Sequence, residues 1–236
     1  DLSAYLFFQF SNISISVSDP HISLFKKYTR KKIIYIPNGI ELMKPNEVVR
    51  EEFILFAAGR IISLKGAHVL IAALNKMKYK GKTIFVGNLD HTPKYKDQLF
   101  ELGKKRDIDY VGLIKEKDKL YNYISKSKIF VFPSFNEGMS NMLLEVASLK
   151  TPLICSDIPE NKAVFSDKEV LYFESGNEED LAIKIKYAIA NYSVMEEMAE
   201  NAEVDIDDIE DRKKPKRKYI LPSSDLLMDP VNISDS

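Results

Sequence analysis

Short, nearly continuous apolar runs alternate along the chain with segments of helical spacing, from about residue 33 to residue 200. Unbroken apolar runs are typical of strands that are covered on both faces. They predict strands over 33–37, 53–59, 83–87, 109–113, 128–134, 151–157 and 170–174. The segments between them predict helices over 65–77, 94–106, 118–127, 141–149 and 178–192. This order predicts an α/β fold, a doubly wound parallel sheet whose ligands bind at the carboxyl ends of the strands.

The two ends of the chain depart from this pattern. The stretch 2–17 is apolar, but Gln9, Asn12 and several serines interrupt it. It is too short and too polar for a membrane-spanning helix of about 20 residues, and it lacks the basic flank of a signal peptide. We therefore predict a strand or a buried helix there. After Ala202, six acidic residues precede six basic ones, which predicts a solvated tail or a truncated extension over 203–236.

The composition narrows the classes of function. The 236 residues correspond to roughly one and a half domains. Lysine plus arginine number 34 and aspartate plus glutamate 35, so the formal net charge is −1 and the basic excess of a nucleic-acid binder is absent. The single cysteine, Cys155, excludes an intramolecular disulfide and a cysteine zinc cluster, and the three histidines have no metal-ligand spacing. Cys155 lies in an apolar run and is predicted to be a small buried hydrophobe.

The segment 130–149 combines a strand end, a loop and a helix start. Glu137 and Gly138 lie in the loop, and Ser140 is the predicted N-cap. The free N–H groups of such a helix start receive phosphate, and glycine permits close approach by a ligand. Glu145 follows Glu137 by 145 − 137 = 8 positions, so the two carboxylates are predicted to flank an anion site and not to form one pair. Spacing alone favours two surface glutamates, because helix starts attract acidic residues anyway.

A second group of charged residues follows another predicted strand. Arg60 comes directly after the run 53–59, and Lys65 with Gly66 opens the next helix. Arginine grips phosphate in a bidentate manner, while lysine acts as a point charge. Taken alone, these are solvated loop residues. Two cations and a helix N-terminus at one sheet edge together predict a diphosphate site.

Several segments, in order, resemble the C-terminal, donor-binding domain of a GT-B glycosyltransferase, of the large retaining class typified by bacterial glycan and capsule transferases (family 4). The resemblance covers about residues 12–200. It rests on PNGI (37–40), GRIISLKG (59–66), YVGLI (110–114), FPSFNEGMSNMLLEVAS (132–148), SDIPE (156–160) and LYFESGNEEDLA (171–182). It implies a Rossmann-like fold for the donor-binding domain.

The resemblance also implies roles for individual residues. Arg60 and Lys65 are expected to bind the donor diphosphate. Glu145 is expected to bind the donor ribose. Glu137 is expected beside the donor sugar, where a carboxylate can position hydroxyls or stabilise a cationic centre. Glu137, Arg60 and Lys65 are the expected catalytic residues. Besides Glu145, the expected donor-binding residues are Gly59, Gly112, Leu113, Gly138, Met139, Ser140 and Asn141. The family is metal-independent, so neither a metal nor a cofactor beyond the donor substrate is expected.

The resemblance implies a retaining hexosyltransferase that moves a sugar from a UDP- or GDP-sugar to a glycan or lipid-linked acceptor in polysaccharide biosynthesis. We expect 1–36 to be the remnant of an N-terminal acceptor domain otherwise missing from this chain, 37–202 to be the donor-binding domain, and 203–236 to be the tail or extension. The expected location is cytoplasmic, with peripheral contact at the inner face of a membrane as a further expectation. Donor binding is expected of this chain, and transfer by it alone is expected to be poor.

Two other interpretations stay open. One is a non-catalytic nucleotide-sugar-binding module that works with a separate acceptor-binding partner, and the other is an epimerase of the same architecture. The two spaced glutamates together with SDIPE favour the transferase. His68 could approach a phosphate but is predicted to be packed or solvated. The basic run 213–218 could attract nuclear import factors or anionic lipid, although its acidic neighbours predict a solvated segment.

Overall fold

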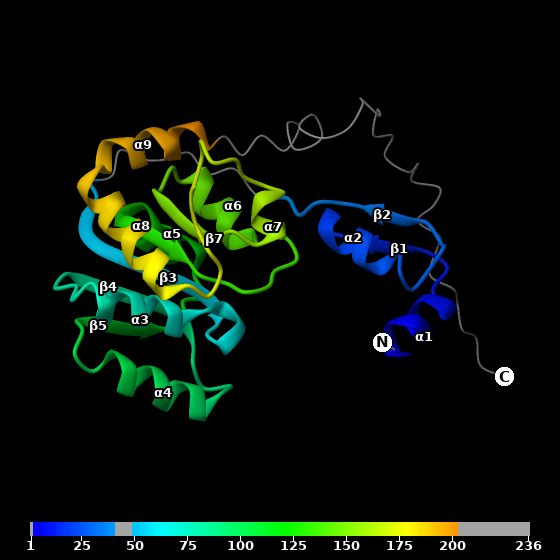
Figure 1. Ribbon diagram of the computed structural model, residues 1–236, viewed down its shortest axis with the longest axis horizontal. Coiled ribbons are helices and arrows are strands. Elements are labelled where there is room, and N and C mark those ends of the chain that lie inside the picture. The colour runs from blue at the N-terminus through cyan, green and yellow to red at the C-terminus, as the bar shows by residue number, and fades with distance from the viewer. Residues whose placement is uncertain (1, 41–48, 203–236) are drawn as a thin grey trace. The chain divides into compact units, whose positions relative to one another are not determined.

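The computed structural model describes residues 2–40 and 49–202 (Figure 1). A six-stranded parallel sheet lies at the centre of 49–202, in the order β5-β4-β3-β6-β7-β8. Its strands are β3 (Glu51–Arg60), β4 (Lys82–Asn88), β5 (Ile108–Gly112), β6 (Ser127–Phe132), β7 (Leu153–Ser156) and β8 (Leu171–Phe173). Its helices are α3 (Ala67–Lys76), α4 (Pro93–Gly103), α5 (Lys117–Lys126), α6 (Asn141–Ser148), α7 (Pro159–Lys162), α8 (Glu178–Ala190) and α9 (Tyr192–Asn201). The predicted doubly wound α/β sheet is confirmed.

The central strand β3 explains why the apolar runs are continuous. Its residues from Phe53 to Ala58 are all buried. Ile54 and Phe56 belong to one hydrophobic cluster with residues of α3, α4 and α8. Leu55 and Ala57 alternate with them, so they point to the opposite face, where α5 packs against α6. Both faces of the strand are therefore covered, and no polar alternation is possible.

A separate, two-stranded parallel sheet lies in 2–40, where β1 (Ser14–Ser16) pairs with β2 (Ile33–Tyr35). The helices beside it are α1 (Leu2–Phe10) and α2 (Asp19–Phe25). The strand expected over 33–37 is thus present, but it belongs to this small sheet and not to the large one. The stretch 2–17 contains both a helix and a strand, and α1 is mostly exposed, because of its residues 5–10 only Phe8 is buried. The expectation of one strand or one buried helix was therefore too simple.

Three local features differ from the sequence pattern. The helix expected over 178–192 ends at Ala190, and α9 follows after Asn191, whose φ of −119° and ψ of 49° lie outside the helical region. The short helix α7 was not predicted. A 3-10 turn, η1 (Ser63–Lys65), precedes α3, so the helix begins at Ala67 and not at Lys65. The predicted tail over 203–236 lies outside the described residues. Within 2–40 and 49–202, no helix has the length and apolar character needed to cross a membrane.

Candidate functional site

The direction in which the sheet is wound reverses between β3 and β6. The chain moves from β3 outward to β4 and β5, then returns to β6 on the other side of β3. In such sheets, ligands bind outside the carboxyl ends of the strands at this switch point, because the loops after the two central strands diverge there. Arg60 is the last residue of β3 and η1 follows it, while the loop that contains Glu137 follows β6.

Lys65 and Glu137 form an ion pair across this switch point. The Nζ atom of Lys65 lies 2.6 Å from Oε1 of Glu137. Glu137 is 9% exposed, and the Lys65 side chain is 27% exposed. The two loops are also joined by the backbone, since Phe135 N–H donates to the carbonyl of Leu64 at 2.9 Å. The prediction that Arg60 and Lys65 approach the Glu137 loop therefore holds for Lys65.

Gly66 allows this close approach of the two loops. Its φ is +70°, in the left-handed region that favours glycine. A Cβ atom at this position would lie 1.9 Å from the carbonyl oxygen of Pro133, which is a backbone atom at the end of β6. Any other residue would therefore separate the start of α3 from the strand whose loop holds Glu137.

Glu145 lies in different surroundings. It is 8% exposed, on the second turn of α6. Tyr121 of α5 donates its hydroxyl to Oε1 of Glu145 at 3.0 Å, and Lys117 Nζ lies 3.5 Å from the same oxygen. The hydroxyl of Tyr121 and the charge of Glu145 raise the pKa of Lys117, and burial raises the pKa of Tyr121. Glu137 and Glu145 are both buried, so the interpretation of the two acids as surface glutamates, which spacing alone favours, is wrong.

The start of α6 lacks the predicted side-chain cap. Ser140 occupies the N-cap position, but its hydroxyl accepts no hydrogen bond from the first turn of the helix. The helix-start amides are therefore not capped by Ser140. The preceding Met139 is buried. Its carbonyl accepts a hydrogen bond from Nδ2 of Asn38 at 2.8 Å, and its sulfur accepts one from the backbone N–H of Asn38. The PNGI segment thus contacts the Glu137 loop directly.

The other predicted site residues lie along the same carboxyl edge without being drawn together. Arg60 is exposed and forms no ion pair within the part of the chain that the structure describes. Gly112 has a φ of +82° and is followed by the exposed Leu113, both at the end of the edge strand β5. At Gly59 and Gly112, a Cβ atom would meet nothing within 4 Å, so close packing does not require glycine there. Gly138, Ser140 and Asn141 remain close to Glu137 through chain continuity.

A packed histidine adjoins the Glu137 loop. The ring of His68 stacks on Phe135, with centroids 5.7 Å apart and an interplanar angle of 16°. Its Nδ1 lies 2.7 Å from the Tyr95 hydroxyl, which also accepts the backbone N–H of His68 at 3.2 Å. The Tyr95 hydroxyl therefore contacts both the ring and the backbone of His68. Burial lowers the pKa of His68, against an opposing effect of Glu178, and burial raises the pKa of Tyr95 to about 12.

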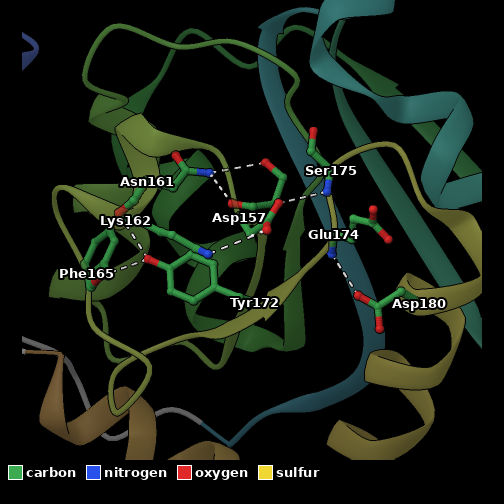
Figure 2. A network of polar contacts seen from close by, with 9 residues as sticks. Asp157, Asn161, Lys162, Phe165, Tyr172, Glu174, Ser175 and Asp180 are labelled. Carbon is green, nitrogen blue, oxygen red and sulfur yellow. Dashed lines mark hydrogen bonds and ion pairs between the residues drawn. The ribbon is translucent and has the colours of Figure 1, made fainter. Parts of the chain in front are cut away.

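Hydrogen bonds from the SDIPE segment and from Asn161, which follows it, connect the ends of neighbouring strands (Figure 2). Buried Asn161 donates from Nδ2 to the carbonyl and the hydroxyl of Ser156, and that hydroxyl donates to the carbonyl of Ser134 after β6. Asp157 accepts the backbone N–H of Ser175 at 3.0 Å. The adjacent Cys155 is buried as predicted, and burial raises the pKa of its thiol. These contacts fix the end of β6, from which the Glu137 loop starts.

Sequence reasoning missed the partners of the site residues. The sequence pattern places Tyr121 on the predicted helix 118–127 and Lys117 just before it, and it assigns no role to either residue or to Tyr95. Each lies more than 20 positions from the residue it contacts in the site. No spacing rule connects such residues, so the sequence carried no signal for these pairs beyond their location on neighbouring elements.

Comparison with known proteins places this chain in a family. The family model described as "Glycosyl transferases group 1" matches residues 40–205. Over 164 residues the chain is 26% identical to the capsular polysaccharide biosynthesis glycosyltransferase CapM of Staphylococcus aureus, a match that covers 67% of this chain and 42% of CapM. Over 160 residues it is 29% identical to N-acetylgalactosamine-N,N'-diacetylbacillosaminyl-diphospho-undecaprenol 4-alpha-N-acetylgalactosaminyltransferase of Campylobacter jejuni, covering 64% of this chain and 42% of that enzyme.

A solved structure has the same fold. The Anabaena protein HepE, in complex with UDP and glucose, superposes with a TM-score of 0.73 and 19% identity, over 85% of this chain and 60% of that chain.

The chain spans about two fifths of the length of the curated relatives described above. The family model covers more than half of its residues. This chain belongs to the group 1 family of glycosyl transferases.

Proposed function

We propose that this chain binds the nucleoside diphosphate sugar of a retaining glycosyltransferase that transfers a hexosyl group to a glycan or lipid-linked acceptor. The observation that carries the proposal is the Lys65–Glu137 ion pair at the switch point of the sheet. It lies just before a helix start whose amides are not capped by Ser140. A buried acid, a cation and helix-start amides at one sheet edge suit a ligand with both a diphosphate and a sugar.

The charges suggest how the site would work. Fixed positive groups stabilise a departing diphosphate, and Lys65, Arg60 and the α6 amides are the groups proposed for this role. Because Glu137 neutralises Lys65 in the structure, an arriving diphosphate competes with Glu137 for the same ammonium group. Binding would then release the Glu137 carboxylate toward the sugar, where it can position hydroxyls or stabilise positive charge at the reacting carbon.

The nucleoside is assigned to the other acid. Glu145 is buried on α6 and has no hydrogen bond to Oε2 within the described residues. A carboxylate oxygen accepts hydrogen bonds from vicinal hydroxyls, so Glu145 is proposed to bind the donor ribose. Gly112 and Leu113, at the end of β5, are proposed to meet the nucleobase.

The relatives support the classes of donor and acceptor. CapM is a glycosyltransferase of capsular polysaccharide biosynthesis, and the name of the Campylobacter enzyme includes a diphospho-undecaprenol, which is a lipid-linked diphosphate. HepE was solved with UDP and glucose. We therefore propose a UDP- or GDP-sugar as the donor for this chain and a glycan or lipid-linked acceptor for the complete reaction.

Calorimetry of the full chain with UDP-, GDP-, ADP- and CDP-sugars tests the proposal. One of the UDP- or GDP-sugars should bind, and Arg60→Ala and Lys65→Ala should each weaken that binding by about tenfold or more, because each removes a charge-assisted contact to phosphate. Lys76→Ala, which removes a lysine paired with Glu179 on the surface, is the matched control. Unchanged affinity in both site variants would contradict the diphosphate assignment.

Two further parts of the proposal have their own measurements. Binding is proposed to be independent of metal ions, so excess EDTA should leave the affinity unchanged, and a strict requirement for Mg²⁺ would contradict this part. Retention is tested by the anomeric configuration of the product, followed by NMR during transfer or slow donor hydrolysis. A product of inverted configuration would exclude the retaining class.

A further inference from the structure

We propose that Tyr121 is a positioning residue for Glu145: its hydroxyl fixes one oxygen of the carboxylate, so that the other oxygen is presented to the ribose hydroxyls of the donor nucleotide. The inference rests on the proposed function and adds to it a residue that determines recognition of the ribose. Lys117 is proposed to contribute charge near this carboxylate but not its orientation.

The geometry of the contact is that of a rigid support. Glu145 and Tyr121 are 8% and 7% exposed, and the hydrogen bond of 3.0 Å between them is buried. The two residues come from α6 and α5, which pack against each other. The hydroxyl is therefore held by the packing of one helix while it restrains a side chain of the other.

Restraint matters for this carboxylate because of its chemistry. The terminal torsion of a glutamate is broad, so an unsupported carboxylate rotates among many orientations. A donor on Oε1 selects one of them, and within 2–40 and 49–202 no group donates a hydrogen bond to Oε2. Ordering a group before the ligand arrives reduces the entropy that binding must overcome. A fixed Oε1 and an available Oε2 are thus suited to a hydroxyl donor.

Tyr121 and Lys117 differ in how well they can perform this task. Lys117 lies 3.5 Å from Oε1, but its side chain is 68% exposed, so water competes for its ammonium group and screens its charge. The Tyr121 side chain is buried, and its hydroxyl is protonated at neutral pH, since the ordinary pKa of tyrosine is about 10 and burial raises it further. It therefore donates to Glu145 without adding charge, and a phosphate attracts it less than it attracts an ammonium group.

The test is calorimetry of the full chain with a matched set of ligands. Each chain is titrated with whichever of UDP and GDP the unmodified protein binds, with the 2′,3′-dideoxy form of that nucleotide, and with inorganic pyrophosphate. The variants are Tyr121→Phe, which keeps the ring and removes one oxygen, and Tyr123→Phe, the same change on the same helix. Tyr123 forms no hydrogen bond through its hydroxyl within the described residues. Lys117→Met is the third variant.

We expect Tyr121→Phe to reduce the preference for the ribonucleotide over its dideoxy form by about tenfold, the effect of one hydrogen bond to a charged group. Its affinity for pyrophosphate should not change, which separates positioning from a general loss of structure. Tyr123→Phe should behave as the unmodified chain, and Lys117→Met should change the preference by less than about twofold.

The other outcomes each overturn a defined statement. If Tyr121→Phe keeps the full ribose preference, or if Lys117→Met loses as much of it as Tyr121→Phe, the inference is wrong while the proposed function stands. If the unmodified chain has no preference for ribose although it binds the nucleotide, Glu145 has no ribose to be positioned for and the inference again fails. If it binds neither nucleotide nor any of their sugars, the proposed function itself fails.

Discussion

The two buried glutamates of the candidate site are stabilised in opposite ways. In the Glu137 cluster (Lys65, Gly66, Phe135 and Glu137), the carboxylate pairs with a lysine from the other side of the switch point. In the Glu145 cluster (Lys117, Tyr121 and Glu145), a neutral buried hydroxyl holds the carboxylate, and the lysine is mostly in water. A ligand phosphate attracts a cationic partner more strongly than a neutral donor. We therefore expect the first cluster to rearrange when a diphosphate binds and the second to change less.

The largest test of this comparison removes the close approach on which the Glu137 cluster depends. Gly66→Ala places a Cβ against the backbone carbonyl of Pro133 at a φ of +70°, so both a clash and an unfavourable backbone conformation follow. We expect a loss of about 3 kcal/mol in the free energy of unfolding, measured with urea. Gly59→Ala is the control, because its Cβ meets no atom within 4 Å, and it should change stability by less than about 0.5 kcal/mol. Equal effects would show that the loops are not held by this contact.

The next effect concerns the two ends of the ion pair. Lys65→Met leaves the Glu137 carboxylate buried without its partner, whereas Glu137→Gln leaves a lysine whose side chain reaches water. Removing one partner of a buried pair is costly because the remaining charge is poorly solvated. We expect Lys65→Met to cost about 2 kcal/mol in the free energy of unfolding and Glu137→Gln to cost about 1 kcal/mol or less. Denaturation in which Glu137→Gln is the more harmful change would reverse our assignment of the buried partner.

A smaller effect reports the exchange of Glu137 for a ligand phosphate. Because Glu137 and a diphosphate compete for Lys65, Glu137→Gln should bind inorganic pyrophosphate about threefold to tenfold more tightly than the unmodified chain, as measured by calorimetry. Glu145→Gln should leave that affinity unchanged, since the lysine beside Glu145 is Lys117 and not Lys65. Weaker pyrophosphate binding by Glu137→Gln would mean that the acid supports the phosphate site and does not compete with it.

The difference between the clusters also marks the limit of what the sequence could predict. The apolar runs placed every strand of the large sheet, and the order of strands and helices placed Lys65 and Glu137 at the same edge. The sequence singles out Glu137 and Glu145 as candidate site residues. It does not predict that they are buried, because burial depends on residues that fold against them from distant segments. The Tyr121–Glu145 contact joins α5 to α6, and His68–Tyr95 joins α3 to α4. Such pairs depend on which helices pack against each other, and helical spacing along the chain does not specify the partner.

Short backbone features were missed for a related reason. The four residues of α7 are too few to show a helical period, and the break at Asn191 separates two segments with similar amphipathic spacing. Ser140 has the residue type and position of an N-cap, yet its hydroxyl does not serve as one. The residue type thus located the helix start correctly, while the hydrogen bond expected from it depended on a side-chain orientation that the sequence does not determine.

The smallest effect we predict is a dependence on pH that affects the Glu137 cluster and not the Glu145 cluster. His68 stacks on Phe135, and burial holds its pKa below the ordinary value of about 6.5. As the pH falls below that value, the unfolded chain takes up a proton that the folded chain resists, so the free energy of unfolding decreases until the lower, folded-state pKa is reached. His68→Phe keeps an aromatic ring against Phe135 and should flatten this part of the decrease in urea titrations between about pH 7 and pH 5, whereas Tyr121→Phe should not. If the free energy of unfolding falls with the same slope in His68→Phe and in the unmodified chain, protonation of His68 does not destabilise the Glu137 cluster. The stability of that cluster would then depend on its ion pair and not on His68.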